Sequence, residues 1–293
     1  MNFTGRRKIW YIISLLIIIP GIISLMLQGF NKGIDFTGGS IIQIQFTKTV
    51  GMEQLREVLD KNMEQSSSIQ SSGDNEYLIR TTHMEESESN AIIQSLKDEL
   101  GELSVLRNDL IGPIMGKELL RNAQLAIVMA LIFMLIYVSF RFKFNFAVSA
   151  VVALAHDVLV MISVFSLLQI EIDSTFVAAI LTILGYSINN TIVVFDRVRE
   201  NIALPRYKKE SFAKIIDDSI NQTLTRSINT VVAVLLLLLS LMFLGGETTQ
   251  FFAFAIVIGI IAGSYSSIFL AGSFLLDITN FRSRPKKIAK DTK

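Results

Sequence analysis

Six apolar runs constrain the fold of this chain more than any other feature of its sequence. A helix that crosses a bilayer needs about 20 apolar residues, and backbone polar groups in lipid must be paired within a helix or a closed barrel. Charged residues make up 18% of the chain and hydrophobic residues 51%, a balance typical of membrane proteins. We predict an α-helical membrane protein with six transmembrane helices. The runs are Ile9–Leu27, Leu119–Phe140, Phe146–Leu168, Ser174–Phe195, Ile220–Leu244 and Phe251–Leu276.

Basic residues of the short loops gather on one side of the predicted membrane. Lysine and arginine are enriched in cytoplasmic loops, whereas the short loops on the other side carry only Glu171, Asp173 and Glu247. Both termini are therefore predicted to be cytoplasmic, with the N-terminus and first helix in 1–30 and a basic tail in 277–293. The basic residues concerned are Arg6, Arg7, Lys8, Arg141, Lys143, Arg197, Arg199, Arg206, Lys208, Lys209, Arg282, Arg284, Lys286 and Lys287.

The polar segment 31–118, between the first two helices, is predicted to form a small extracytoplasmic α+β domain. The stretches SIIQIQF, SSSIQ, YLIRTT and LSVLRNDLIG are typical of strands, and a turn at 72–75 joins the middle two. Residues 52–63 and 85–100 are predicted to be helices, the second with acidic residues in its first turn, as the helix dipole favours. The order β-α-β-β-α-β predicts a ferredoxin-like sandwich.

The region 119–276 is predicted to be a five-helix transmembrane bundle with one long cytoplasmic loop at 197–219. Pro205 marks a break within this loop because proline interrupts helical hydrogen bonding. Residues 211–220 are predicted to form a short amphipathic helix that lies along the inner membrane surface.

His156 and Asp157 are the ionisable residues deepest inside the predicted helices. They lie about 16 Å from the inner end of the third helix, near the membrane midplane. A charge there costs at least about 2.5–3.5 kcal/mol, so Asp157 faces a partner or a watery interior, or stays protonated. Two interpretations remain open: a proton or transport role, and a neutral aspartate that hydrogen-bonds neighbouring helices. His156 points away from Asp157 around the helix and fits packing as well as function.

Further polar residues lie in the fourth and fifth helices. Tyr186, Ser187, Asn189 and Asn190 fall inside the fourth run, where lipid disfavours polar side chains that it can reach. We predict that they face the bundle interior. Arg226 lies near the cytoplasmic start of the fifth helix, where it fits either a functional role or an interfacial arginine that extends to the headgroups.

Three patterns are interpreted as structural. Asp196 and Arg197 mark the inner end of the fourth helix, and Gly259 and Gly263 form a GxxxG face for close helix packing. The stretch GIDFTGGS follows the first helix, but no Lys-Ser/Thr and no helix start follow it, so it is not a phosphate loop. It is predicted to be a turn and strand entry that fixes the outer domain to the membrane. Its residues of interest are Gly33, Asp35, Gly38 and Gly39.

The sequence lacks the motifs of several functional classes. Zero cysteines exclude disulfides, zinc-thiolate sites and iron–sulfur clusters. Two histidines without an HExxH motif predict no metal site, and no nucleophile elbow supports hydrolysis. No nucleotide-binding motif appears, so no cofactor, no enzymatic activity and no nucleic-acid partner are predicted. An ion gradient is the remaining energy source for work in a lipid bilayer.

Four motifs resemble the SecF family, the smaller membrane subunits of the SecDF protein-export complex within the resistance-nodulation-division superfamily. They are GIDFTGGS, ALAHDVLV, GYSINNTIVVFDRVREN and LTRS, in family order over nearly the whole chain. The resemblance implies a SecD partner, association with the SecYEG channel and indirectly with SecA, and a translocating polypeptide as substrate. It also implies that a proton gradient (sodium in some members) drives export across the cytoplasmic membrane.

The family's fourth-helix motif, Gly-Tyr-Ser-φ-Asn-Asp-Thr/Ser with φ apolar, begins at Gly185. Its proton-carrying aspartate falls on Asn190, and an amide cannot bind and release a proton near neutral pH. The family's fifth-helix arginine falls on Arg226, and its third-helix His-Asp on His156 and Asp157. Three explanations of Asn190 remain open. The residue is a deliberate replacement, or the relay runs through Asp157 and SecD, or this is a paralogue with altered ion coupling.

Two other functions are compatible with the sequence. One is half of a small-molecule or lipid exporter of the same superfamily, although such exporters usually carry much larger outer domains than 31–118. The other is a purely structural subunit that stabilises its partner, which the amide at Asn190 favours.

Overall fold

A computed structural model describes residues 1–62, 68–73, 75–81 and 84–283. The predicted turn at 72–75 and the basic tail lie partly outside the described residues. The chain divides into two compact units. The sheet unit comprises Asn31–Leu125 and Glu171–Ser174, and the bundle unit comprises Met1–Phe30, Ala126–Ile170 and the chain from Thr175 onward.

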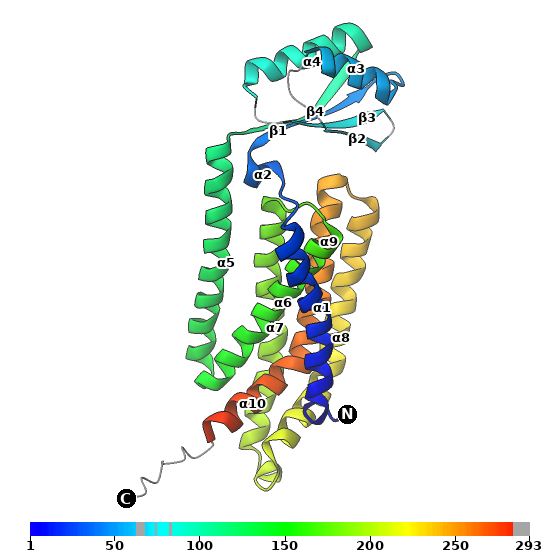
Figure 1. Cartoon of the computed structure of the whole chain (residues 1–293). Helices are drawn as coiled ribbons and strands as arrows, with labels where there is room; N and C mark the ends of the chain where they lie inside the picture. Colours follow the sequence, from blue (N-terminus) through cyan, green and yellow to red (C-terminus); the bar gives the residue numbers. More distant parts are fainter. Residues whose placement is uncertain (63–67, 74, 82–83, 284–293) are drawn as a thin grey trace, which may run out of the picture. The chain divides into compact units, whose positions relative to one another are not determined.

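The sheet unit contains four antiparallel strands with two helices on one face (Figure 1). The strand order is β2-β3-β1-β4, and Ile42 of β1 pairs with Ile79 of β3 and Asn108 of β4. Apolar residues from β1, β3, α3 and α4 form its core, because alternate strand residues and one helix face point inward. The elements are α2 (Ile34–Thr37), β1 (Gly39–Phe46), α3 (Met52–Asn62), β2 (Ser68–Gly73), β3 (Glu76–Thr81), α4 (Glu86–Leu100) and β4 (Leu103–Ile111).

Within the described ranges the chain forms six long apolar helices, as the sequence predicts, and each is long and apolar enough to cross a membrane. The last one contains a short π-helical segment, η3, between two α-helices. The elements are η1 (Thr4–Arg6), α1 (Arg7–Gln28), α5 (Pro113–Arg141), α6 (Phe144–Leu168), α7 (Ser174–Ala203), η2 (Pro205–Tyr207), α8 (Phe212–Leu244), α9 (Glu247–Tyr265), η3 (Ser266–Leu270) and α10 (Ala271–Ser283).

The polar stretch expected as a cytoplasmic loop at 197–219 is mostly helical. Helix α7 continues to Ala203, just before Pro205, and α8 begins at Phe212. The prediction of a separate amphipathic helix over 211–220 is wrong, because this segment runs without interruption into the fifth apolar helix. Neither glycine nor proline occurs between Phe212 and Leu244, so nothing stops the helix from propagating.

Small residues allow the first helix to pack closely on the third. A Cβ atom at Gly21 of α1 would overlap Ser163 of α6. One turn further on, the Ser24 hydroxyl donates to the Ser166 carbonyl at 3.0 Å. The backbones of α1 and α6 therefore approach each other along this seam, and any side chain at Gly21 would separate them.

Helices α5 and α8 bury little of their apolar surface. Only 6% of the residues in the most apolar stretch of each are buried, against 56% in α6, 50% in α7 and 61% in the last helix, Thr249–Phe281. An apolar side chain that no protein covers is stable only against lipid or another chain. These two helices, together with the first, of whose most apolar stretch 22% is buried, therefore provide free apolar surface.

Candidate functional site

A fully buried carboxylate, Asp157, lies at the centre of the bundle unit. It projects from α6 and is 0% exposed. The Ser187 hydroxyl of α7 donates to its Oδ2 atom at 2.6 Å, and the Ser266 hydroxyl of η3 donates to the same atom at 2.9 Å. Hydrogen bonds of this kind stabilise a carboxylate that has lost its water. Three separate helices thus meet at one ionisable group.

The neighbouring histidine extends this network to the first helix. His156 Nδ1 lies 3.1 Å from Asp157 Oδ1, and Nε2 lies 3.0 Å from the Ser14 hydroxyl oxygen of α1. The Ser14 hydroxyl is also 3.1 Å from the Trp10 carbonyl, which accepts a 2.6 Å hydrogen bond from the Tyr265 hydroxyl. Both ring nitrogens of His156 are therefore paired, and the chain of contacts runs from Asp157 to α1.

Glycine and a widened helical turn let the last helix reach the site. A Cβ atom at Gly263 would lie 2.9 Å from Ser187 Cβ, and one at Gly259 would overlap Ile183. The GxxxG face therefore packs α9 directly against α7. Beyond Tyr265 the helix widens into η3, and π-helical turns of this kind are frequent at functional sites. The adjacent residues Ser266 and Ser267 of η3 then contact different helices, because Ser267 pairs with Thr191 of α7 at 2.9 Å.

The polar residues of the fourth apolar run divide between two faces of α7. Asn190 is buried, with 5% exposed, whereas Asn189 and Gly185 are exposed. Among the described residues, neither the Tyr186 hydroxyl nor the Asn190 side-chain nitrogen has a hydrogen-bond partner. The prediction that all of these side chains face the bundle interior thus holds for Asn190 and Ser187, and it is wrong for Asn189.

Within the part of the chain that the structure describes, Asn190 makes no hydrogen bond with Arg226, Asp196 or Arg197. Arg226 lies on an exposed face of α8. Asp196 pairs with Arg141 at 3.1 Å and with Arg199 at 2.9 Å. Arg197 pairs with Glu200 and donates to Gln222. The Asp196–Arg141 ion pair joins α7 to the end of α5, and the Arg197–Gln222 hydrogen bond joins α7 to α8, which is a structural role.

The GIDFTGGS stretch belongs to the sheet unit, where it holds the loop between α6 and α7. The Gly33 amide donates to the Ile172 carbonyl at 2.8 Å, and Asp35 accepts from the Ser174 amide at 2.8 Å. Ser174 is the first residue of α7. Asp35 therefore binds a free amide at the N-terminus of that helix, where a negative charge is also favoured by the helix dipole. Gly38 and Gly39 connect this turn to β1.

An ion pair that the sequence did not predict supports the same loop. The Arg80 guanidinium of β3 pairs with the Glu171 carboxylate. Burial raises the pKa of Glu171, and the adjacent Arg80 opposes this shift. The sequence gives no sign that these two residues pair, because they lie 91 positions apart.

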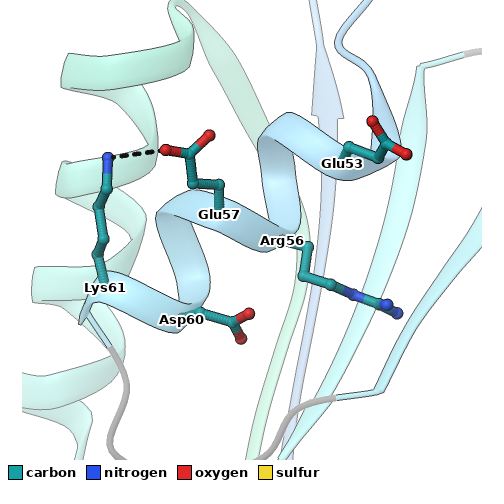
Figure 2. A pocket seen from close by; sticks show the side chains of 5 residues that line it. All are labelled: Glu53, Arg56, Glu57, Asp60 and Lys61. Carbon is teal, nitrogen blue, oxygen red and sulfur yellow. Dashed lines mark ion pairs between the residues drawn. The ribbon is translucent and has the colours of Figure 1, made fainter.

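A hollow on α3 does not qualify as a functional site. Figure 2 shows that it is lined by charged side chains of both signs along one exposed helix, with Lys61 and Glu57 paired at 3.4 Å. Such exposed pairs on one helix contribute little. No group of three or more metal-ligating His, Asp or Glu side chains occurs within the part of the chain that the structure describes.

Known proteins resemble this chain over nearly its whole length. The family described as protein export membrane protein SecD/SecF, C-terminal, matches residues 91–281, and the SecD/SecF GG motif matches residues 23–50. The protein translocase subunit SecF of Sebaldella termitidis is 41% identical, over 98% of this chain and 94% of that protein. The subunit of the same name from Vibrio alginolyticus is 40% identical, over 95% of this chain and 90% of that protein.

Solved structures agree with these sequence matches. The crystal structure of SecDF from Thermus thermophilus, a translocon-associated membrane protein, superimposes with a TM-score of 0.82 at 35% identity over 96% of this chain. A second SecDF structure, in a super-membrane-facing form, gives a TM-score of 0.70 at 36% identity. This chain spans 39% of the length of each SecDF chain. The chain is therefore a multi-pass membrane protein that belongs to the SecF family of protein translocase subunits.

Proposed function

We propose that this chain works with a SecD-type partner and uses a proton gradient to promote Sec-dependent protein export, without enzymatic activity of its own. The observation that carries the proposal is the buried Asp157, which accepts hydrogen bonds from two other helices and is linked to His156 on its own helix. An ionisable group at this depth is costly, and a structural role would be met by a neutral side chain. The network can therefore exchange protons, which supports a proton gradient as the source of energy.

A second chain is expected to cover the free surface of α5, α7 and α8. Gly185 and Asn189 are exposed on α7, and a polar face inside a membrane span needs protein or water beside it. Transporters built from repeats place their site at the interface between the halves. The SecDF relatives carry additional chain beyond the part that this protein matches, which supports SecD as the missing half. Contacts with the SecYEG channel, and indirectly with SecA, follow from the same pathway.

The proposed orientation places both termini in the cytoplasm and the sheet unit, as a ferredoxin-like sandwich, outside the cytoplasmic membrane. The chain contains no cysteine, so single-cysteine variants test this directly. Ser104→Cys, on the exposed side of β4, is expected to react with an impermeant thiol reagent in intact cells. Lys208→Cys, exposed after α7, is expected to react only after the membrane is opened. Labelling of both sites in intact cells would contradict the charge-based orientation.

Asn190→Asp is expected to increase gradient-dependent export several-fold, because it adds a titratable group to the buried face of α7. The Asn190 amide nitrogen has no hydrogen-bond partner among the described residues, so its replacement by oxygen removes no donated hydrogen bond. Export of a reporter protein into inverted vesicles would be measured with and without a protonophore. Asn189→Asp, one position along on the exposed face, is the matched control and is expected to change export less. An equal effect of both variants would remove Asn190 from the ion path.

A further inference from the structure

Asp157 has one oxygen atom left to exchange a proton. Its Oδ2 atom accepts from Ser187 and, when the Ser266 hydroxyl is not turned to the Gly263 carbonyl at 3.1 Å, from Ser266 as well, which occupies the two lone pairs of that oxygen. Its Oδ1 atom faces His156 Nδ1 at 3.1 Å. A hydrogen bond across this gap contains one hydrogen atom, bonded either to Oδ1 or to Nδ1.

The other nitrogen of His156 faces the Ser14 hydroxyl, which has a more distant acceptor in the Tyr265 hydroxyl oxygen at 3.5 Å and two nearer ones. The Ser14 hydroxyl donates either to the Trp10 carbonyl at 3.1 Å or to His156 Nε2 at 3.0 Å. When it donates to Trp10, Nε2 must carry a hydrogen atom, and the His156–Asp157 pair has no net charge. When it turns to Nε2, that nitrogen is bare, and the pair holds one proton fewer and a net charge of −1.

Tyr265 allows this rotation without leaving a buried carbonyl unpaired. Its hydroxyl donates to the same Trp10 carbonyl at 2.6 Å, so that oxygen keeps a side-chain partner in both arrangements. The groups that face the pair are the hydroxyls of Ser14 on α1, Ser187 on α7, and Ser266 with Tyr265 on the last helix. Tyr265 is the titratable group among them, and it remains a donor to Trp10 throughout.

We propose that His156 and Asp157 store one exchangeable proton, and that Ser14 of α1 is the positioning residue that switches the pair between its loaded and unloaded forms. The inference rests on the proposed ion-coupled function. On unloading, the Nε2–H bond of His156 breaks, water takes the proton, and the lone pair left on Nε2 accepts the Ser14 hydroxyl hydrogen. Loading is the reverse. The first helix is thereby part of the proton path and not only a membrane anchor.

The chain offers a direct spectroscopic test. It has two histidines, His83 and His156, so the full chain carrying His83→Gln, in lipid nanodiscs with ¹⁵N-labelled histidine, reports on His156 alone. Between about pH 5 and about pH 8, the Nε2 signal is expected to lose its bonded hydrogen. The Nδ1 signal is expected to remain that of a hydrogen-bonded nitrogen.

Two substitutions are expected to move this transition in opposite directions. Ser14→Ala leaves a buried N–H unpaired in the loaded form, which costs more than an unpaired acceptor, so half-release is expected about one pH unit lower, a tenfold change. Tyr265→Phe removes one of the two hydroxyls that donate to the Trp10 carbonyl, so the Ser14 hydroxyl is held there more strongly. Half-release of the Nε2 proton is therefore expected to move to higher pH. Ser14→Thr is expected to restore the transition. Ser24→Ala, which removes another α1 hydroxyl that bonds α6, is expected to leave it unchanged.

The outcomes separate this inference from the proposed function. A proton that stays on Nε2 across the whole range would overturn it. Equal effects of Ser14→Ala and Ser24→Ala, or shifts of Ser14→Ala and Tyr265→Phe in the same direction, would overturn it too. If instead the transition behaves as expected but a protonophore does not affect export, proton storage stands and the proposed coupling to export fails.

Discussion

Asp157→Asn is expected to reduce protein export to the level measured without a gradient, while the protein remains folded. Asparagine has the shape of aspartate, and its Oδ1 atom can accept from the Ser187 and Ser266 hydroxyls that now donate to Asp157. Its amide nitrogen would then donate permanently to His156 Nδ1, which lies 3.1 Å from Asp157 Oδ1. The geometry of the loaded form is kept, but no proton can leave.

The measurement compares gradient-driven export and thermal unfolding in the same preparations. Asp157→Asn is expected to change the free energy of unfolding by less than about 1 kcal/mol. Asp157→Ala serves as the contrast, because it leaves buried donors of three helices unpaired and is expected to cost about 3–5 kcal/mol. If Asp157→Asn exports normally and Asn190→Asp changes the gradient dependence, the coupling group lies at position 190 instead.

Gly38→Ala is expected to destabilise the sheet unit by about 3 kcal/mol or more. Gly38 has φ 75° and ψ 154°, a region that only glycine occupies readily and that costs other residues about 1–3 kcal/mol. An added Cβ atom would also lie 2.6 Å from Pro113 Cα, a backbone atom. Overpacking of this kind typically costs a further 1–3 kcal/mol or so.

Two other glycines separate these contributions. Gly101 has φ 103° but no atom within 4 Å of an added Cβ, and Gly112 has an ordinary φ and equally open space. Gly101→Ala is therefore expected to show only the conformational cost, and Gly112→Ala to be nearly neutral. Unfolding would be followed by limited proteolysis of the sheet unit in the full chain. A Gly38→Ala variant as stable as Gly112→Ala would mean that Pro113 moves away freely.

Elements that depend on local pattern were predictable from the sequence. The apolar runs located the six helices, although α7 continues to Ala203 instead of Phe195 and α8 begins at Phe212 instead of Ile220. Leu55, Val58 and Leu59 share one face of α3, and all three are buried. Both results follow because hydrophobic periodicity and run length are properties of neighbouring residues.

Contacts across the bundle were not predictable from one sequence. Ser14 is essential to the His156 network but is 142 positions away from it. A serine in an apolar helix gives no signal by itself, because its hydroxyl is often satisfied by the preceding turn, as Ser149 is by the Asn145 carbonyl. The sequence placed Arg226 near the cytoplasmic start of the fifth helix, but a position along a helix does not determine which way a side chain points.

Asp35 gives the fourth long helix a fixed end. It binds the Ser174 amide at the first residue of α7, and Ser187 lies further along the same unbroken helix, about 20 Å away at 1.5 Å per residue. An α-helix resists compression because each turn is hydrogen-bonded to the next. A sliding movement of α7 by even 1 Å or so would therefore strain the contacts between Asp35 and Ser174 at the far end. The helix behaves as a stiff rod, so Ser174 and Ser187 cannot move along its axis independently of each other.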